Sequence, residues 1–213
     1  MSDQDQADAL RRDGRRLCVL SVVIALLEGA LSIPAGLAAG SIALLGFGLD
    51  SVIEASSSAA VLWGMAEPDQ SKRERKEKRS LRFVGVTLLA LAAYITYASV
   101  HDLLVRAEAQ RSLFGIAVLL ASGVAMIWLR RAKRTLAASL DSDALAADAK
   151  QSEFCAYLSG IALAGVGANA AFGLWWADPV AALVMVPVVI REGLEAAQGK
   201  ACAHDQLIRE RGR

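Results

Sequence analysis

The chain has 213 residues, 55% of them hydrophobic, and its 23 Lys and Arg against 22 Asp and Glu leave a formal net charge of +1. The charged residues are concentrated in short stretches between long apolar ones, whereas a soluble domain spreads them along the chain. This distribution argues against a soluble enzyme, a disordered chain and a nucleic-acid binder with an overall basic charge. It predicts an all-α, polytopic membrane protein.

The apolar stretches are long enough to cross a bilayer, which takes about 20 mostly apolar residues in a helix. We predict six transmembrane helices, at about Leu17–Ala38, Ile42–Met65, Leu81–Val100, Leu113–Leu129, Ala147–Phe172 and Pro179–Leu194. They form one domain over residues 16–197, with an amino-terminal tail at 1–15 and a short carboxy-terminal tail at 198–213. The first tail does not read as a secretory signal, because its polar stretch is long and no small-residue cleavage site follows.

The basic residues lie in alternate connections between the predicted spans, and this distribution predicts how the protein is oriented in the membrane. They gather at 11–16, 72–82, 130–134 and 200–213, whereas the turns near residue 40 and at 175–178 have none. Lys and Arg are enriched in cytoplasmic loops. We therefore expect both termini in the cytoplasm and the protein in the cell (inner) membrane.

Two carboxylates of the second predicted span are the main candidates for a functional site. Asp50 and Glu54 lie four residues apart, on one face of a helix, with Cβ atoms about 5–6 Å apart. A charge at the bilayer centre costs about 2.5–3.5 kcal/mol, and two such carboxylates repel each other unless a proton or a cation intervenes. Pairing with Lys or Arg is the alternative, but none lies well inside a predicted span, and the nearest is Lys150. The pair predicts a cation site that exchanges protons for a metal ion.

The fifth predicted span carries a matching polar stripe. Four residues recur at i, i+3, i+4 and i+7, along one side of a helix: Asp148, Gln151, Ser152 and Cys155. Carboxylate, amide oxygen and thiol can bind metals, and a thiolate favours zinc or another soft-to-borderline ion. The structural alternatives are a helix cap for Asp148, an interhelical hydrogen bond for Gln151 and simple burial for Cys155. Asp148 and Glu28, which lies in the first span, are candidate additional ligands or proton-relay acids. The alternative for Glu28 is a hydrogen bond with a serine of a neighbouring helix.

Three segments resemble the cation diffusion facilitator family. The family's second span, in which Gly-Ser-x-Ala-Leu precedes two acids four residues apart, is similar to GSIALLGFGLDSVIEASSSAAVLWG. Its sixth span resembles WWADPVAALVMVPVVIREGLEA, and the place of its fifth is taken by ADAKQSEFCAYLSG. The resemblance covers about residues 15–197 and agrees with the family's six spans and cytoplasmic termini.

The resemblance implies export of a divalent metal, chiefly zinc, in exchange for protons, by a homodimer. The family's site uses two acids of the second span and a His-x-x-x-Asp of the fifth. Asp50 and Glu54 match the acids, whereas Gln151 stands in the place of the histidine and Cys155 in that of the aspartate. We also expect a short form that lacks the family's cytoplasmic domain.

Our interpretation is a zinc efflux transporter that works by alternating access. Its expected partners are the divalent cation, protons and the lipid bilayer, with no further cofactor and no nucleic acid. One alternative is a non-transporting membrane subunit or metal sensor, because Gln151 and Cys155 depart from the family's ligands. Another is a proton-coupled exporter of organic cations. The carboxy-terminal Cys202 and His204 form only a weak metal-binding pattern, and no catalytic motif indicates an enzyme.

Overall fold

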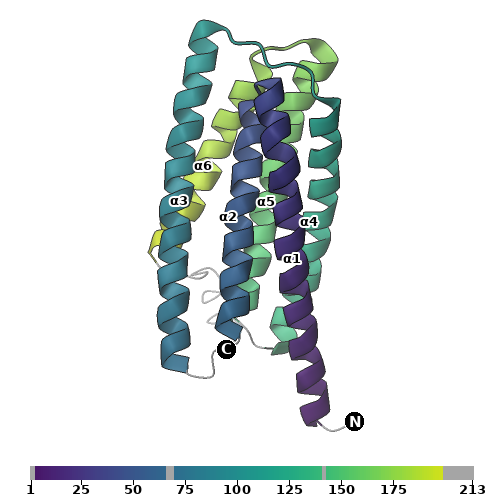
Figure 1. Ribbon diagram of the computed structural model, residues 1–213, viewed down its shortest axis with the longest axis vertical. Coiled ribbons are helices and arrows are strands. Elements are labelled where there is room, and N and C mark those ends of the chain that lie inside the picture. The colour runs from purple at the N-terminus through teal and green to yellow at the C-terminus, as the bar shows by residue number, and fades with distance from the viewer. Residues whose placement is uncertain (1–2, 66–69, 141–142, 199–213) are drawn as a thin grey trace, which may run out of the picture.

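The computed structural model describes residues 3–65, 70–140 and 143–198, and its secondary structure in these ranges is helical (Figure 1). The helices are α1 (Asp3–Ala39), α2 (Ile42–Met65), α3 (Gln70–Val105), α4 (Leu113–Leu140), α5 (Asp143–Phe172) and α6 (Ala177–Ala197). Each of the six predicted apolar segments lies inside one of them. The all-α prediction is therefore confirmed.

Several helices continue beyond the predicted apolar segments into charged sequence. Helix α1 includes most of the predicted amino-terminal tail, and α3 includes the basic run that precedes its apolar part. Helix α4 runs on from the predicted end at Leu129 to Leu140. These extensions are rich in Arg, Lys, Glu and Ala, which favour helix, so a helix does not end where the apolar sequence ends.

The predicted weak metal-binding pattern of Cys202 and His204 lies outside the described residues.

Five of the helices are long and apolar enough to cross a membrane, namely α1 to α5. Helix α6 differs, because every stretch of 18 residues within it contains at least three of its charged residues Asp178, Arg191, Glu192 and Glu195. The protein is thus a polytopic helical membrane protein. The sixth span remains a prediction, and so does the placement of the termini.

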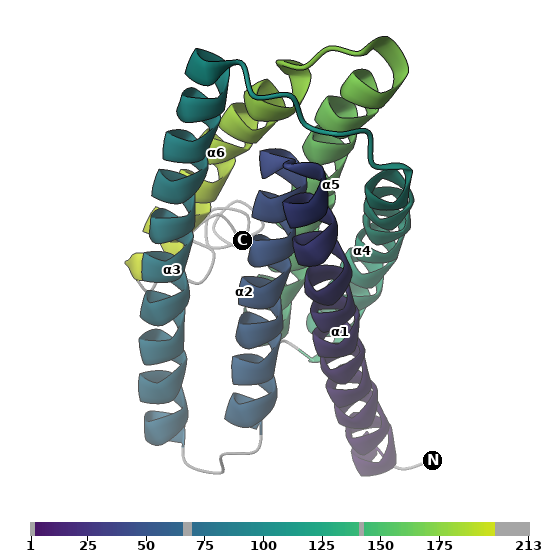
Figure 2. The same ribbon diagram turned by 45° about the horizontal axis from the view of Figure 1, so that its top comes forward.

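The helices run roughly along one long axis, with α2 in the middle (Figure 1). Helix α2 contacts α1, α3, α5 and α6, while α4 packs on α1 and α5. Helices α3 and α6 pack against each other to one side (Figures 1 and 2). The turns that join α1 to α2, α3 to α4 and α5 to α6 lie at one end of the bundle (Figure 1). The basic groups at 11–16 and 130–134 lie toward the opposite end, as the positive-inside pattern requires.

The first turn of α2 is anchored by an acid from α6. Asp178 accepts hydrogen bonds from the hydroxyl of Ser41 at 2.5 Å and from the backbone N–H of Ile42 at 2.8 Å. The first backbone N–H groups of a helix have no partner within it, and a carboxylate there also favours the helix dipole. The contact fixes where α2 begins relative to α6.

The interior of the bundle contains a group of buried charged side chains among large apolar ones. Large apolar side chains such as Phe47, Met126 and Met185 are fully buried. Charged side chains are seldom buried without a partner, yet six of the described ones are at most 5% exposed. One is Asp178, at the start of α6, and the other five are Glu28, Asp50, Glu54, Lys133 and Asp148. These five lie on α1, α2, α4 and α5, which therefore surround the candidate site.

Candidate cation site

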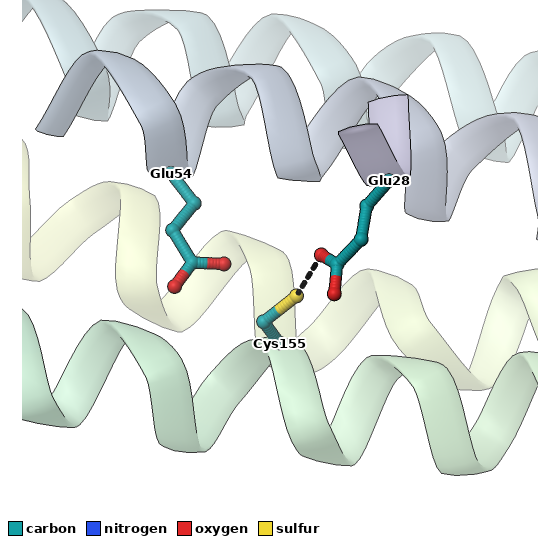
Figure 3. A group of neighbouring side chains, drawn as sticks. All are labelled: Glu28, Glu54 and Cys155. Atoms are coloured by element: carbon teal, nitrogen blue, oxygen red, sulfur yellow. Dashed lines mark hydrogen bonds between the residues drawn. The ribbon is translucent and has the colours of Figure 1, made fainter. Parts of the chain in front are cut away.

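Three side chains from three helices meet in the interior of the bundle. Glu28 on α1, Glu54 on α2 and Cys155 on α5 are buried, and each offers a ligand atom within 4.8 Å of the other two. Figure 3 shows the carboxylate of Glu28 and the thiol of Cys155 directed toward each other, with the carboxylate of Glu54 beside them. The thiol of Cys155 donates a hydrogen bond of 3.8 Å to Oε2 of Glu28.

The separations among these atoms suit a small divalent cation. Bonds of about 2.0–2.3 Å from zinc to oxygen and sulfur, at tetrahedral angles, place the ligand atoms about 3.5 Å apart. The 3.8 Å between Cys155 Sγ and Glu28 Oε2 is already close to that value. The remaining separations are at most 4.8 Å, about 1.3 Å longer than in such a site.

Glu28 is held in place by hydroxyl donors from two neighbouring helices. Ser122 on α4 donates to one carboxylate oxygen at 2.6 Å, and Ser51 on α2 donates to the other at 3.3 Å. A buried carboxylate needs such donors because it has lost its contact with water. The predicted serine partner of Glu28 is thus confirmed, whereas its role as an additional ligand or proton relay remains a prediction.

Asp50 and Glu54 form the predicted acidic pair on the buried side of α2. Asp50 is 2% exposed and lies one turn before Glu54 on the same helix. Oδ2 of Asp50 and Oε2 of Glu54 are buried and accept no hydrogen bond from the described residues. A buried polar atom without a partner costs about 1–3 kcal/mol, and a charged one more. Both oxygens are therefore suited to take a proton or a cation.

Two other polar residues of the α5 stripe have different surroundings. Gln151 is 5% exposed and lies one turn before Cys155 on the same helix, and its role as a ligand remains a prediction. The hydroxyl of Ser152, which is fully buried, donates to Oε1 of Glu54 at 3.1 Å. Of the four predicted ligands, the structure brings Glu54 and Cys155 into one cluster and adds Glu28 to them.

Asp148 has a counter-charge, contrary to the expectation that no Lys or Arg lies near the buried acids. Its carboxylate pairs with Lys133 at 2.8 Å, and both side chains are 0% exposed. Ser58 donates a further hydrogen bond to it at 2.6 Å. The expectation is wrong because α4 continues past the apolar segment and carries Lys133 into the bundle. Glu153 is likewise paired, with Arg130 at 3.0 Å.

Lys133 and Ser122 were missed as parts of the site, although a signal for both is present in the sequence. The buried face of α4 recurs every three or four residues through Ser122, Met126, Leu129, Lys133 and Ala137. This helical period passes through the charged segment without a break. Following the period rather than the hydropathy would have placed Lys133 on the inner face.

No known family model matches the chain. The chain is similar to Transmembrane protein 163 of Xenopus laevis, with 28% identity over 145 residues. The match covers 67% of this chain and 51% of that protein, so the chain spans about half the length of this relative. Similarity to a transmembrane protein agrees with the presence of five helices that are long and apolar enough to cross a membrane. The chain is a multi-pass membrane protein. Its resemblance to the cation diffusion facilitator family remains a prediction.

Proposed function

We propose that this protein is a divalent-cation efflux transporter that exchanges its cargo for protons, with zinc as the favoured cargo. The observation that carries the proposal is the buried cluster of Glu28, Glu54 and Cys155, whose ligand atoms lie within 4.8 Å of one another. Each charge at the centre of a membrane costs about 2.5–3.5 kcal/mol, so such a cluster is a poor packing element. A divalent cation compensates the negative charges and gives the three groups a common partner.

The donor set favours zinc or a chemically similar ion as the cargo. Magnesium and calcium prefer sites made entirely of oxygen ligands, whereas a thiolate binds soft and borderline ions such as zinc. Cys155 therefore directs the preference, and Glu28 and Glu54 supply negative charge. Asp50 and Gln151, each one turn away along its helix, are proposed to complete the coordination during transport.

Proton exchange follows from the chemistry of these ligands. Carboxylate and thiol groups bind a metal in their deprotonated forms, so binding releases protons, and protons arriving later displace the metal. In the proposed cycle the site opens alternately to the two sides of the membrane, as in other transporters. The end with the basic groups would face the cytoplasm. Protons that enter the cell down their gradient would then drive the cation outward, which is efflux.

The remaining parts of the proposal rest on the sequence resemblance. They are membership of the cation diffusion facilitator family and a homodimeric assembly. Residence in the cell (inner) membrane with both termini cytoplasmic is proposed from the distribution of basic residues. The lipid bilayer, the cation and protons are then the partners of the protein. No further cofactor is proposed.

The proposal is tested by zinc flux and opposing proton flux in proteoliposomes that contain the full chain. Glu54→Gln removes one cluster carboxylate, and Glu153→Gln is the matched control. Glu153 lies outside the cluster, is 26% exposed and pairs with Arg130 at 3.0 Å. Loss of a residue that only supports a metal ligand already costs about 10–100-fold in affinity or activity. We therefore expect at least a tenfold loss of flux for Glu54→Gln and near wild-type flux for the control.

Two results would redirect the proposal. If Glu54→Gln moves zinc and protons at the wild-type rate, the cluster is not the transport site. If the wild type binds zinc in a titration but moves none, the protein is a metal sensor or a non-transporting subunit instead.

A further inference from the structure

Lys133 is an unusual residue because its ammonium group is fully buried beside a candidate cation site. Three acceptors surround it: Oδ2 of Asp148 at 2.8 Å, the backbone carbonyl of Asp148 at 3.5 Å and Oγ of Ser152 at 2.8 Å. An ammonium group has three hydrogens to donate and cannot accept. The three acceptors therefore account for all of its hydrogens and hold it in one position between α4 and α5.

The hydrogen bond from Lys133 to Ser152 determines where the hydroxyl of Ser152 donates its own hydrogen. Because Ser152 accepts from Lys133, the hydroxyl hydrogen of Ser152 is left to donate elsewhere. Oε1 of Glu54 lies at 3.1 Å and the backbone carbonyl of Asp148 at 3.4 Å. A carboxylate is the stronger acceptor of the two. The hydroxyl of Ser152 is thus directed at Glu54.

The result is a difference between the two oxygens of the Glu54 carboxylate. Oε1 accepts from Ser152, whereas Oε2 is buried and accepts no hydrogen bond from the described residues. Oε2 is the oxygen left to bind a cation. Second-layer hydrogen bonds of this kind orient metal-binding carboxylates in other proteins.

We propose that Lys133 and Ser152 are positioning residues of the cation site, which present one oxygen of Glu54 to the cation, and that Asp148 serves to hold Lys133. The inference rests on the proposed function and deepens it. It gives Asp148 a supporting role in place of the predicted ones of ligand or proton relay. The positive charge of Lys133 also offsets part of the negative charge that two carboxylates and a thiolate place around a divalent cation.

The principal test uses Ser152→Ala, which removes the hydrogen bond to Glu54 and leaves the pair of Lys133 with Asp148 intact. Ser159→Ala is the matched control, since Ser159 is also buried on α5 but donates to the backbone carbonyl of Ala156. The full chain in detergent is titrated with cobalt(II), whose visible spectrum reports the number and geometry of its ligands. We expect Ser152→Ala to weaken cobalt binding by about 10–100-fold and to change the spectrum of the bound ion. We expect Ser159→Ala to change neither.

A second variant tests the role of the ion pair as a unit. Lys133→Met alone leaves a buried carboxylate without its partner and can prevent folding, so it is combined with Asp148→Asn. We expect this double variant to weaken cobalt binding about as much as Ser152→Ala does. Adding Ser152→Ala to it should cost little more, because both changes act on the same oxygen of Glu54.

The outcomes separate this inference from the proposed function. If the wild type binds no cobalt or zinc, the proposed function fails. If the wild type binds and Ser152→Ala binds equally well with the same spectrum, the positioning role is refuted while the proposed function stands. The positioning role would also be refuted if the losses of cobalt affinity caused by Ser152→Ala and by the double variant add fully when the three changes are combined. If the double variant does not fold, Ser152→Ala decides alone.

Discussion

The contact between α3 and α6 is predicted to depend on the absence of a side chain at Gly85. A Cβ atom at this position would lie 2.6 Å from the backbone oxygen of Gly193 and also against the backbone nitrogen of Ala197. Ordinary contacts of this kind begin at 3.4 Å, so Gly85→Ala must push the two helices apart by several tenths of an ångström. Backbone atoms cannot turn aside as a flexible side chain can.

The magnitude follows from two opposing effects. Overpacking of a close contact costs about 1–3 kcal/mol, and a backbone clash belongs at the upper end of that range. Alanine favours helix over glycine by about 1 kcal/mol, which offsets part of the cost. We therefore expect Gly85→Ala to lower the free energy of unfolding by about 2 kcal/mol, which corresponds to about 4–8 °C in Tm for a protein of this size.

The assay is thermal unfolding of the full chain in detergent, with Gly160→Ala as the matched control. Gly160 is also inside a helix, but a Cβ atom there would have nothing within 4 Å. Only the helix-forming effect remains, so the control should be unchanged or more stable by up to about 1 kcal/mol. Equal Tm values for the two variants would show that α3 and α6 do not approach each other as closely as the structure has them.

Two further predictions concern the thiol and the end of α6. In a Cys202→Ser background, the ultraviolet charge-transfer band of cadmium bound to thiolate should disappear with Cys155→Ser and persist with Cys18→Ser; a band that survives Cys155→Ser would remove Cys155 from the site. The hydrogen bond from Lys150 lowers the pKa of Glu195, which lies beyond the apolar part of α6, below its usual 4.5. Stability from this pair is present above the usual pKa and is lost as the pH falls through the lowered one, so Lys150→Met should flatten the pH dependence of Tm below about pH 4.5. An unchanged profile in that variant would mean that the pair does not couple α5 to α6.

Much of the fold was predictable because its causes are local. Long apolar stretches must form helices in a membrane, where the backbone has no other partner for its hydrogen bonds. The same reasoning placed Asp50 and Glu54 on one buried face of a helix, since a separation of four residues is slightly more than one turn. Helices α1, α3 and α4 continue beyond the predicted spans because a helix extends as far as propensity allows, not only as far as the sequence is apolar.

The composition of the candidate site was less predictable because it depends on which helices are neighbours. The sequence by itself singled out Glu54 and Cys155 and suggested Glu28, but it could not bring α1, α2 and α5 together at one level. Helical period shows which side of a helix is buried but not which helix it faces or at what height. Only the tertiary structure placed Lys133 against Asp148, in a buried ion pair that joins residues 15 positions apart on two helices.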